Sequence, residues 1–220
     1  MYVGHYSAAL VIKKYQPKLS LGWLFLAVQL VDIAFFSLVL MGIEKLRIVK
    51  HATPSTHFEL LYMPYTHSLI ATAVWSLFAF YIAWLISRKR GIAIAFAIAV
   101  CSHWFFDLLV HTQDLPIWRN SSPKLGLGLW NFPYLTYSLE AILLIFGLLV
   151  YLCASKAQNR LGRYGIVSLV IFLLLVNGIN LFGPPFGKQA WTLAVPALVS
   201  YFFFAVLAFW LDRYRQTKKT

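Results

Sequence analysis

Six apolar segments, each long enough to cross a membrane, limit how this chain can fold. They occupy approximately residues 21–43, 65–86, 91–111, 134–152, 164–182 and 191–211. A helix of about 20 apolar residues spans the hydrocarbon layer of a bilayer, which is about 30 Å thick. Hydrophobic residues make up 60% of the chain and charged residues only 12%, which excludes an ordinary soluble domain. The sequence therefore predicts an all-α integral membrane protein with six transmembrane helices.

A shorter, moderately apolar segment, residues 2–15, precedes the first span and ends in Lys13-Lys14. Because an α-helix rises 1.5 Å per residue, a half-helix folded back on the first span would carry His5 to nearly the depth of Asp32. The alternative is an amphipathic helix in the membrane interface, with His5 exposed. We therefore expect a short N-terminal helix that is either re-entrant or interfacial.

The basic residues predict the orientation of the chain in its membrane. The net charge of +12 resembles that of a nucleic-acid-binding protein, but the Lys and Arg residues lie between the apolar segments, so no nucleic-acid partner is expected. Thirteen of the 19 fall on the side that holds residues 13–18, 88–90, 156–163 and the C-terminal tail. The positive-inside rule places that side in the cytoplasm. No cleavable signal peptide is recognisable, and the bacterial inner membrane is the expected location.

The chain shows no internal repeat, no low-complexity tract and no separate soluble domain. Residues 1–220 are therefore expected to form a single membrane domain. Within it, residues 1–115 hold most of the candidate metal-binding residues, and residues 116–220 supply an outer loop and supporting helices. Two polar connections, residues 44–63 and 112–133, are expected to be loops, and the first carries two histidines that we expect to be solvated, His51 and His57.

The segment Ser102–His111 holds the most informative polar pattern. His103, Asp107 and His111 recur every fourth residue, which places them along one side of a helix. His and Asp at this spacing can reach one divalent metal. His103 and His111 are about 12 Å apart along the axis, so either two metals share Asp107 or one histidine acts as an acid, base or supporting group. Such residues also join helices in membranes, although ionisable groups at this depth are costly and usually functional.

Other polar residues are predicted at the same depth, among them Asp32, His67 and Glu140, with two amides, Asn177 and Asn180. Imidazoles and carboxylates without a thiolate set suit a divalent metal, with zinc favoured. Such a metal lowers the pKa of a bound water. Glu140 and Asp114 are candidates for the general base, and His111 is a candidate for the acid.

Four short motifs also carry a family resemblance. They are Gly4-His5-Tyr6, Val31-Asp32-Ile33, Pro64-Tyr65-Thr66-His67-Ser68-Leu69 and Ser102-His103-Trp104-Phe105-Phe106-Asp107. In this order they resemble the bacterial membrane-bound metal-dependent hydrolase family over roughly residues 1–115. The resemblance implies a metal site made by His5, Asp32, His67, His103 and Asp107. The chain departs from the family's usual Pro-Asp-x-Asp step, which here reads Val31-Asp32-Ile33-Ala34 and lacks one carboxylate.

The sequence favours a hydrolase that acts on a lipid-like or amphiphilic ester, amide or phosphoester. One alternative is an ion-coupled transporter that uses Asp32, Asp107 and Glu140 as an ion pathway. Another is a structural membrane protein whose helices are tied together by a metal. The lack of repeats and the concentration of histidines at one depth argue against the transporter.

Overall fold

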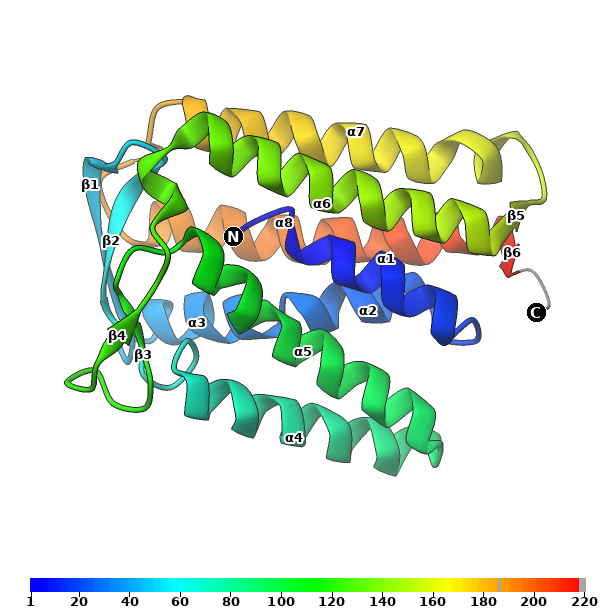
Figure 1. The fold of residues 1–220 in the computed structure, drawn as a ribbon, viewed down its shortest axis with the longest axis horizontal. Helices are drawn as coiled ribbons and strands as arrows, with labels where there is room; N and C mark the ends of the chain where they lie inside the picture. The colour runs from blue at the N-terminus through cyan, green and yellow to red at the C-terminus, as the bar shows by residue number, and fades with distance from the viewer. Residues whose placement is uncertain (186, 218–220) are drawn as a thin grey trace.

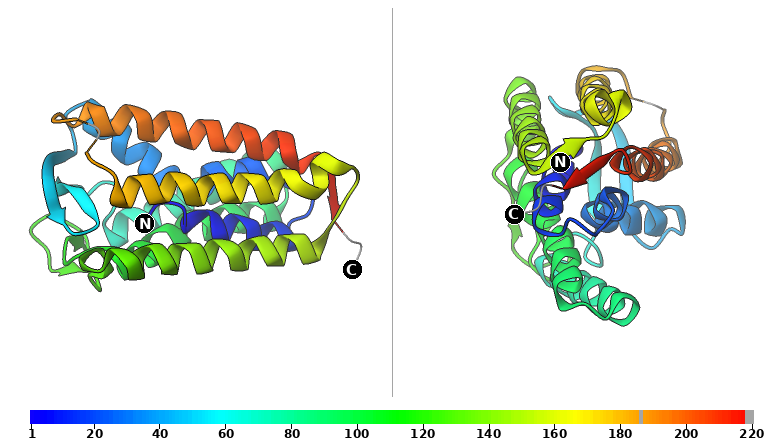
Figure 2. Two further views of the ribbon diagram at one scale, coloured as in Figure 1. Left: turned by 90° about the horizontal axis from the view of Figure 1, so that it is seen from above. Right: turned by 90° about the vertical axis from the view of Figure 1, so that its right-hand side faces the viewer.

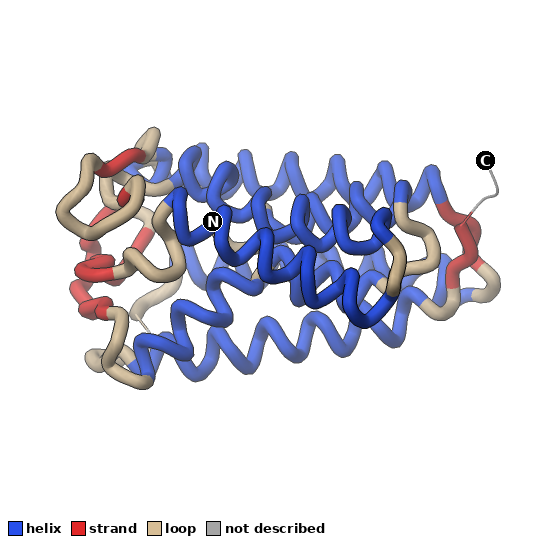
Figure 3. The backbone as a smooth tube through the Cα atoms, turned by 90° about the horizontal axis from the view of Figure 1, so that it is seen from below, coloured by secondary structure: helices blue, strands red, loops and turns tan. Residues whose placement is uncertain are grey.

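Long helices aligned along one axis form the body of the molecule, and short strands lie at its two ends (Figure 1, Figure 3). The structure, a computed structural model, describes residues 1–185 and 187–217. Its helices are α1 (His5–Tyr15), α2 (Leu21–Val28), α3 (Leu30–Leu40), α4 (Leu69–Ser87), α5 (Arg90–Val110), α6 (Pro133–Ala154), α7 (Arg160–Phe182) and α8 (Trp191–Asp212). The predicted all-α fold is confirmed.

The helices α4 to α8 are each long and apolar enough to cross a membrane, and α2 and α3 together make up a sixth span. Their outward faces are apolar. On α4, for example, the exposed side chains include Ile70, Val74 and Leu77, which a lipid environment would cover. The chain is therefore a multi-pass membrane protein.

The first span is broken, although the sequence predicts one straight helix over residues 21–43. α2 and α3 meet at Gln29 with a bend of 53°. The last carbonyl groups of a helix lack intrahelical donors, and that of Val28 accepts a hydrogen bond from His103 Nδ1 at 2.7 Å. A side chain bonded into the backbone ladder is a known cause of a kink. The break leaves Asp32 in the first turn of α3.

The N-terminal helix α1 is re-entrant. It begins near the middle of the bundle, runs to one end and packs against α2, α5 and α6 (Figure 1, Figure 2). A close approach to α6 is possible because Gly147 has no side chain; a Cβ there would lie 2.8 Å from the Ser7 carbonyl oxygen. His5 is fully buried, so the alternative of an interfacial helix with an exposed His5 is wrong.

A β-hairpin covers one end of the bundle, where the sequence predicts a loop over residues 44–63. Its strands are β1 (Lys45–Thr53) and β2 (Thr56–Tyr62). Leu46 pairs with Leu60 and Ile48 with Phe58, and these apolar side chains pack on the helices below. Apolar residues at alternate positions are the signature of a half-buried strand, so the pattern was present in the sequence.

The other strands are short. β3 (Leu115–Pro116) pairs with β4 (Lys124–Leu125) in the second predicted loop, which also contains the 3₁₀ helix η1 (Leu129–Asn131). β5 (Ser155–Ala157) pairs with β6 (Arg215–Thr217) at the opposite end. That end also carries the α1–α2 and α4–α5 turns (Figure 1), so the three basic connections and the basic tail lie together, away from the hairpin.

The start of α4 differs from the prediction in a way that matters for the site. The helix begins at Leu69 rather than near Tyr65, because the Ser68 side chain accepts a hydrogen bond from the backbone N–H of Ala71 at 3.0 Å and caps it. His67 therefore lies in the turn before the helix, which lets its side chain reach into the bundle.

Candidate functional site

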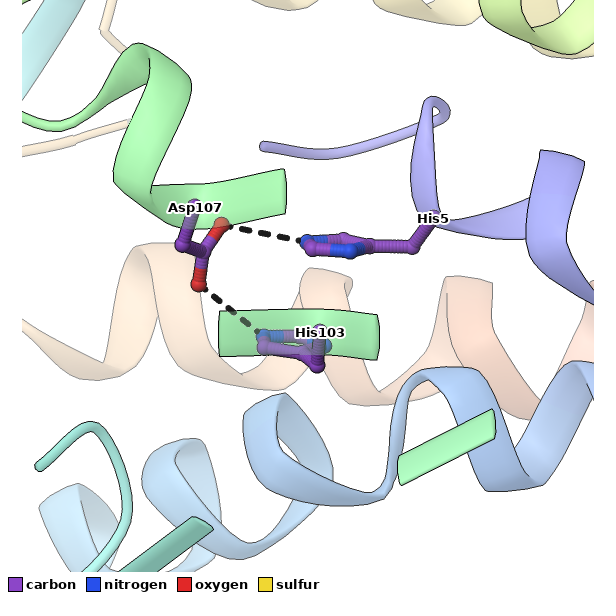
Figure 4. A group of neighbouring side chains, drawn as sticks. All are labelled: His5, His103 and Asp107. Atoms are coloured by element: carbon purple, nitrogen blue, oxygen red, sulfur yellow. Dashed lines mark ion pairs between the residues drawn. The ribbon is translucent and has the colours of Figure 1, made fainter. Parts of the chain in front are cut away.

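Five buried residues from four parts of the chain meet in the half of the bundle nearer the hairpin. They are His5 on α1, Asp32 on α3, His67 before α4, and His103 and Asp107 on α5. They form two groups, His5–His103–Asp107 and Asp32–His67–His103, and in each group one ligand atom of every residue lies within 4.8 Å of the others. Figure 4 shows the first group, with both imidazoles directed at Asp107. The site residues predicted from the sequence thus converge; their role as metal ligands stays a prediction.

The separations between these atoms match those of metal ligands. Asp32 Oδ1 lies 3.2 Å from His67 Nε2 and 3.5 Å from His103 Nε2. Asp107 Oδ2 lies 3.2 Å from His103 Nε2 and 3.7 Å from His67 Nε2. Ligand atoms at about 2.0–2.1 Å around a tetrahedral zinc ion are about 3.4 Å from one another. Asp32, His67 and His103 therefore have the separations of the ligands of one ion, and Asp107 belongs with His5 and His103 to a second group.

His5 extends the cluster on the other side of Asp107. Its Nε2 lies 3.2 Å from Asp107 Oδ1, and its ring stacks on that of His103 with the centroids 3.8 Å apart and an interplanar angle of 6°. The amino group of Met1 contacts the same carboxylate oxygen, Asp107 Oδ1.

Hydrogen bonds behind the histidines fix which ring nitrogen faces the cluster. His103 Nδ1 lies 2.7 Å from the Val28 carbonyl oxygen. Because a carbonyl only accepts, His103 carries a proton on Nδ1 and directs Nε2 toward the carboxylates, 3.2 Å from Asp107 Oδ2 and 3.5 Å from Asp32 Oδ1. An outer partner of this kind orients most metal-binding histidines.

His67 is oriented by a chain of two further residues. The Thr66 hydroxyl donates to Glu44 Oε2 at 2.6 Å, and His67 Nδ1 lies 2.8 Å from Thr66 Oγ1. Since the hydroxyl proton goes to the carboxylate, His67 Nδ1 is the donor to Thr66, and its Nε2 faces Asp32 Oδ1 at 3.2 Å. Burial raises the pKa of the Glu44 carboxyl, and the hydrogen bonds from Thr66 and Tyr65 oppose this rise.

Three nitrogen atoms of the cluster have no hydrogen-bond partner within the part of the chain that the structure describes. They are Nδ1 and Nε2 of His5 and Nε2 of His103, all buried. Unpaired buried polar atoms are costly, and in a neutral imidazole ring the Nε2 lone pair would face a carboxylate and repel it. A cation between them removes both problems, and a borderline divalent ion suits imidazole and carboxylate donors. The residues present therefore fit a metal ion.

His111 lies beside the cluster, just after the end of α5. Its Nδ1 is 2.9 Å from Asp114 Oδ1, and its Nε2 is 3.7 Å from Asp107 Oδ1. The ring packs against Trp130 with the centroids 4.0 Å apart. A histidine held by a carboxylate on one nitrogen and facing a reaction site with the other is suited to proton transfer.

Glu140, a predicted general base, is buried on α6 and occupied by backbone donors. Its Oε2 accepts hydrogen bonds from the N–H groups of Tyr2 at 3.0 Å and Gly4 at 2.9 Å. A carboxylate at the N-terminus of a helix stabilises it, so Glu140 holds α1 in the bundle. Its role as a base stays a prediction, as does that of Asp114.

Sequence reasoning missed several supporting residues. The Tyr201 hydroxyl on α8 donates to Asp32 Oδ2 at 3.0 Å, and no pattern distinguishes this tyrosine within its apolar span. Thr66 and Glu44 orient His67 as described above. His57, expected to be solvated, is half-buried, and its Nε2 donates to the Gly183 carbonyl at 2.9 Å. Only His51 is exposed as expected.

A cavity of about 370 Å³ adjoins the cluster, and we call it the site cavity. Asp32, His67, Asp107, His111 and Glu140 line its polar end. Its other walls come from α3, α7, α8 and the hairpin. Its volume lies within the range of small-molecule sites, about 300–1,000 Å³. Asn180 lines it, whereas its predicted partner Asn177 is buried outside the lining.

Comparisons with protein-family models, curated proteins and solved structures found no match to this chain. The resemblance to the membrane-bound metal-dependent hydrolases therefore stays a prediction based on the motifs. The functional argument depends on the geometry of the cluster and the site cavity.

Proposed function

We propose that this protein is a membrane-embedded, metal-dependent hydrolase that acts on a lipid-like or amphiphilic ester, amide or phosphoester. The main support is the convergence of imidazole nitrogens on two buried carboxylates at the separations of metal ligands. The site cavity beside them supplies space for a substrate, which a metal that only ties helices together would not need.

The metal site would comprise His5, Asp32, His67, His103 and Asp107. Zinc is the favoured ion, because the set offers nitrogen and oxygen donors without thiolates. A divalent ion bound there would supply Lewis acidity and lower the pKa of a water molecule. Tyr201, Thr66 and the Val28 carbonyl would keep the donor atoms in place.

The remaining groups would manage the protons of hydrolysis. The water oxygen forms a bond to the acyl carbon or phosphorus, while the bond from that atom to the leaving oxygen or nitrogen breaks. One water proton passes to a base, for which Asp114 and Glu140 are the candidates. His111 would donate a proton from Nε2 to the leaving group, while Asp114 stabilises the charged ring through Nδ1.

The basic end of the bundle supports the predicted orientation. Among the described residues, eleven of the 19 Lys and Arg residues of the chain lie at that end, which would face the cytoplasm of a bacterial inner membrane. The His/Asp cluster would then lie in the outer half of the membrane, below the hairpin.

The first test is the metal content of the purified protein. Wild type, His103→Ala and Asp107→Ala would be prepared in detergent without chelators and analysed by elemental mass spectrometry. His51→Ala is the matched control, because His51 is an exposed histidine on the hairpin. We expect near-stoichiometric zinc, or another divalent metal, in wild type and His51→Ala and its loss in the two cluster variants. A metal-free wild type would overturn the metallohydrolase and bring the ion-transporter reading forward.

Activity is tested next with the metal-loaded protein in mixed micelles that present lipid esters, amides and phosphoesters. Hydrolysis that is lost in His103→Ala and kept in His51→Ala would support the proposal. Tightly held metal without hydrolysis of any of these bond classes would favour the metal-tied structural protein.

A further inference from the structure

Away from the His/Asp cluster, most of the lining of the site cavity is an apolar wall. It includes Phe36 on α3, Phe58 and Leu60 on the hairpin, and Val176 and Leu193 on α7 and α8. The polar residues of the lining there, among them Ser55, Thr56, Asn180 and Thr192, are uncharged. A ligand that fits both this wall and the cluster has a long apolar part and a polar group at one end of it.

The exposed residues of the lining show where the site cavity opens. Among its described lining residues, only three are exposed: Ile179 on α7, Pro196 on α8 and Pro184 between these helices. Ile179 is 62% exposed and lies in a membrane-spanning helix, as does Pro196. The opening therefore lies between α7 and α8, on the outer surface of the spans that lipid would cover.

The lipid-facing surface continues on both sides of this opening. On α7, Leu175 is 61% exposed, and on α8, Val199 is 63% exposed. Pro196 lacks a backbone N–H, which removes the hydrogen bond that would join it to the carbonyl four residues earlier, that of Thr192. Thr192 also lines the site cavity, as does the small residue Ala197. The missing backbone hydrogen bond at Pro196 and the small side chain of Ala197 therefore both lie beside the opening.

The hairpin closes the other approach. Its residues that line the site cavity include Ser55, Thr56 and Phe58, and none of those that the structure describes is exposed. Phe58 packs edge-to-face on Trp130, with the centroids 5.9 Å apart, and the Ser55 N–H donates to the Trp130 carbonyl at 3.1 Å. His57 adds the hydrogen bond to Gly183. A ligand from the aqueous side would need to displace these contacts, whereas one from the bilayer would not.

We propose that the site cavity binds an acyl chain of a membrane lipid, which enters sideways from the bilayer between α7 and α8. The chain lies along the apolar wall, and the bond that joins it to the headgroup reaches the His/Asp cluster. The identification of this lipid as the substrate rests on the proposed hydrolase function, whereas acyl-chain binding does not depend on it.

Photolabelling tests the site directly. The full-length protein is reconstituted in vesicles of phosphatidylethanolamine and phosphatidylglycerol that contain a phospholipid with a diazirine in one acyl chain. After irradiation, labelled residues are located by mass spectrometry. We expect label on lining residues away from the opening, such as the buried Phe36 and the half-buried Leu60, as well as on the lipid-facing Leu175. Label confined to lipid-facing residues would overturn the proposal.

A matched pair of variants sharpens the test. Ala197→Phe fills the site cavity, and Val199→Phe adds the same ring on the lipid-facing side of α8. We expect Ala197→Phe to reduce interior labelling several-fold and to leave labelling of Leu175 unchanged, while Val199→Phe behaves as wild type. Equal interior labelling in all three proteins would contradict the proposal. If Ala197→Phe does not fold, the position of the label in wild type still decides.

The metal content of the same samples separates this proposal from the preceding one. Interior labelling of a wild-type protein that holds no metal would support the acyl-chain site and overturn the hydrolase. Metal in wild type without interior labelling would overturn the acyl-chain site alone.

Discussion

Two buried polar clusters occupy the two halves of the bundle, and they differ in how well their atoms are paired. In the basic half, Lys13 Nζ donates to Asp212 Oδ2 at 2.7 Å and to the Leu19 carbonyl at 2.7 Å. The Tyr151 hydroxyl donates to Asp212 Oδ1 at 2.8 Å, and the Leu21 N–H donates to Oδ2 at 3.0 Å. This cluster has one cation, one anion and donors on both carboxylate oxygens, so it needs nothing further.

The His/Asp cluster near the hairpin is built differently. Two carboxylates face several imidazoles, and both ring nitrogens of His5 and Nε2 of His103 have no hydrogen-bond partner in the described chain. Both clusters hold α1 in the bundle, but only one is complete without a ligand. Buried groups that are left unpaired cost stability, and proteins retain such costs mainly at functional sites. The comparison therefore separates a structural ion pair from a site prepared for a cation.

Breaking the complete cluster should have the largest effect on folding. Asp212→Ala leaves the Lys13 ammonium group buried without its partner, which costs about 3–5 kcal/mol. Tyr151→Phe removes a single hydrogen bond and should cost about 1 kcal/mol. The free energy of unfolding in mixed micelles measures both, with and without zinc. Equal losses in the two variants would mean that the ion pair contributes little, and a loss that zinc restores would contradict the division between the clusters.

The incomplete cluster should instead respond to metal. Free zinc at a thousand times its dissociation constant should raise the free energy of unfolding of wild type by about 4 kcal/mol. His103→Ala should lose this response, because His103 belongs to both ligand groups, and His51→Ala should keep it. Thermal unfolding with and without zinc makes the measurement. A zinc response that survives in His103→Ala would place the ion elsewhere.

Proton transfer can be separated from metal binding at the edge of the cluster. His111→Gln removes the proposed acid and should lower the hydrolysis rate by about 10²–10⁴-fold. Zinc content should stay as in wild type, because His111 is outside both ligand groups. Rates of the metal-loaded proteins in mixed micelles provide the readout. Unchanged hydrolysis would exclude His111 as the acid, and loss of zinc would make it a ligand.

The difference between the two clusters also shows what the sequence can reveal. His103 and Asp107 were recognisable because residues four apart lie on one face of a helix. His5 was recognisable because a helix folded back on the first span would bring it to the depth of Asp32. The bend at Gln29 could not be recognised from the sequence, because neither Pro nor Gly lies at this position. The bend depends on a hydrogen bond from His103, which is distant in sequence. Tyr201 was equally hidden, because its contact with Asp32 exists only after α3 and α8 pack together.

The hairpin was missed for a different reason. The polarity of residues 44–63 predicts a loop. Leu46 and Ile48, however, alternate with polar residues as in a strand. Because the hairpin lines and covers the site cavity, the loop prediction also omitted one wall of that cavity. The alternation of apolar residues and the overall polarity of a segment carry separate information, and in residues 44–63 the alternation predicts the observed structure.

The smallest expected effect tests the chain of residues behind His67. Thr66→Val keeps the shape of the side chain but removes the hydroxyl that joins His67 Nδ1 to Glu44, and Thr66→Ser keeps the hydroxyl. Loss of such an outer partner lowers metal affinity by about 10–100-fold, so we expect this loss in Thr66→Val and near wild-type affinity in Thr66→Ser. Competition with a chromophoric chelator measures the zinc dissociation constants. Equal affinity in the two variants would show that His67 needs no orientation from Thr66. The His/Asp cluster would then depend less on outer partners than its unpaired nitrogens indicate, and would resemble the complete Lys13–Asp212 pair in this respect.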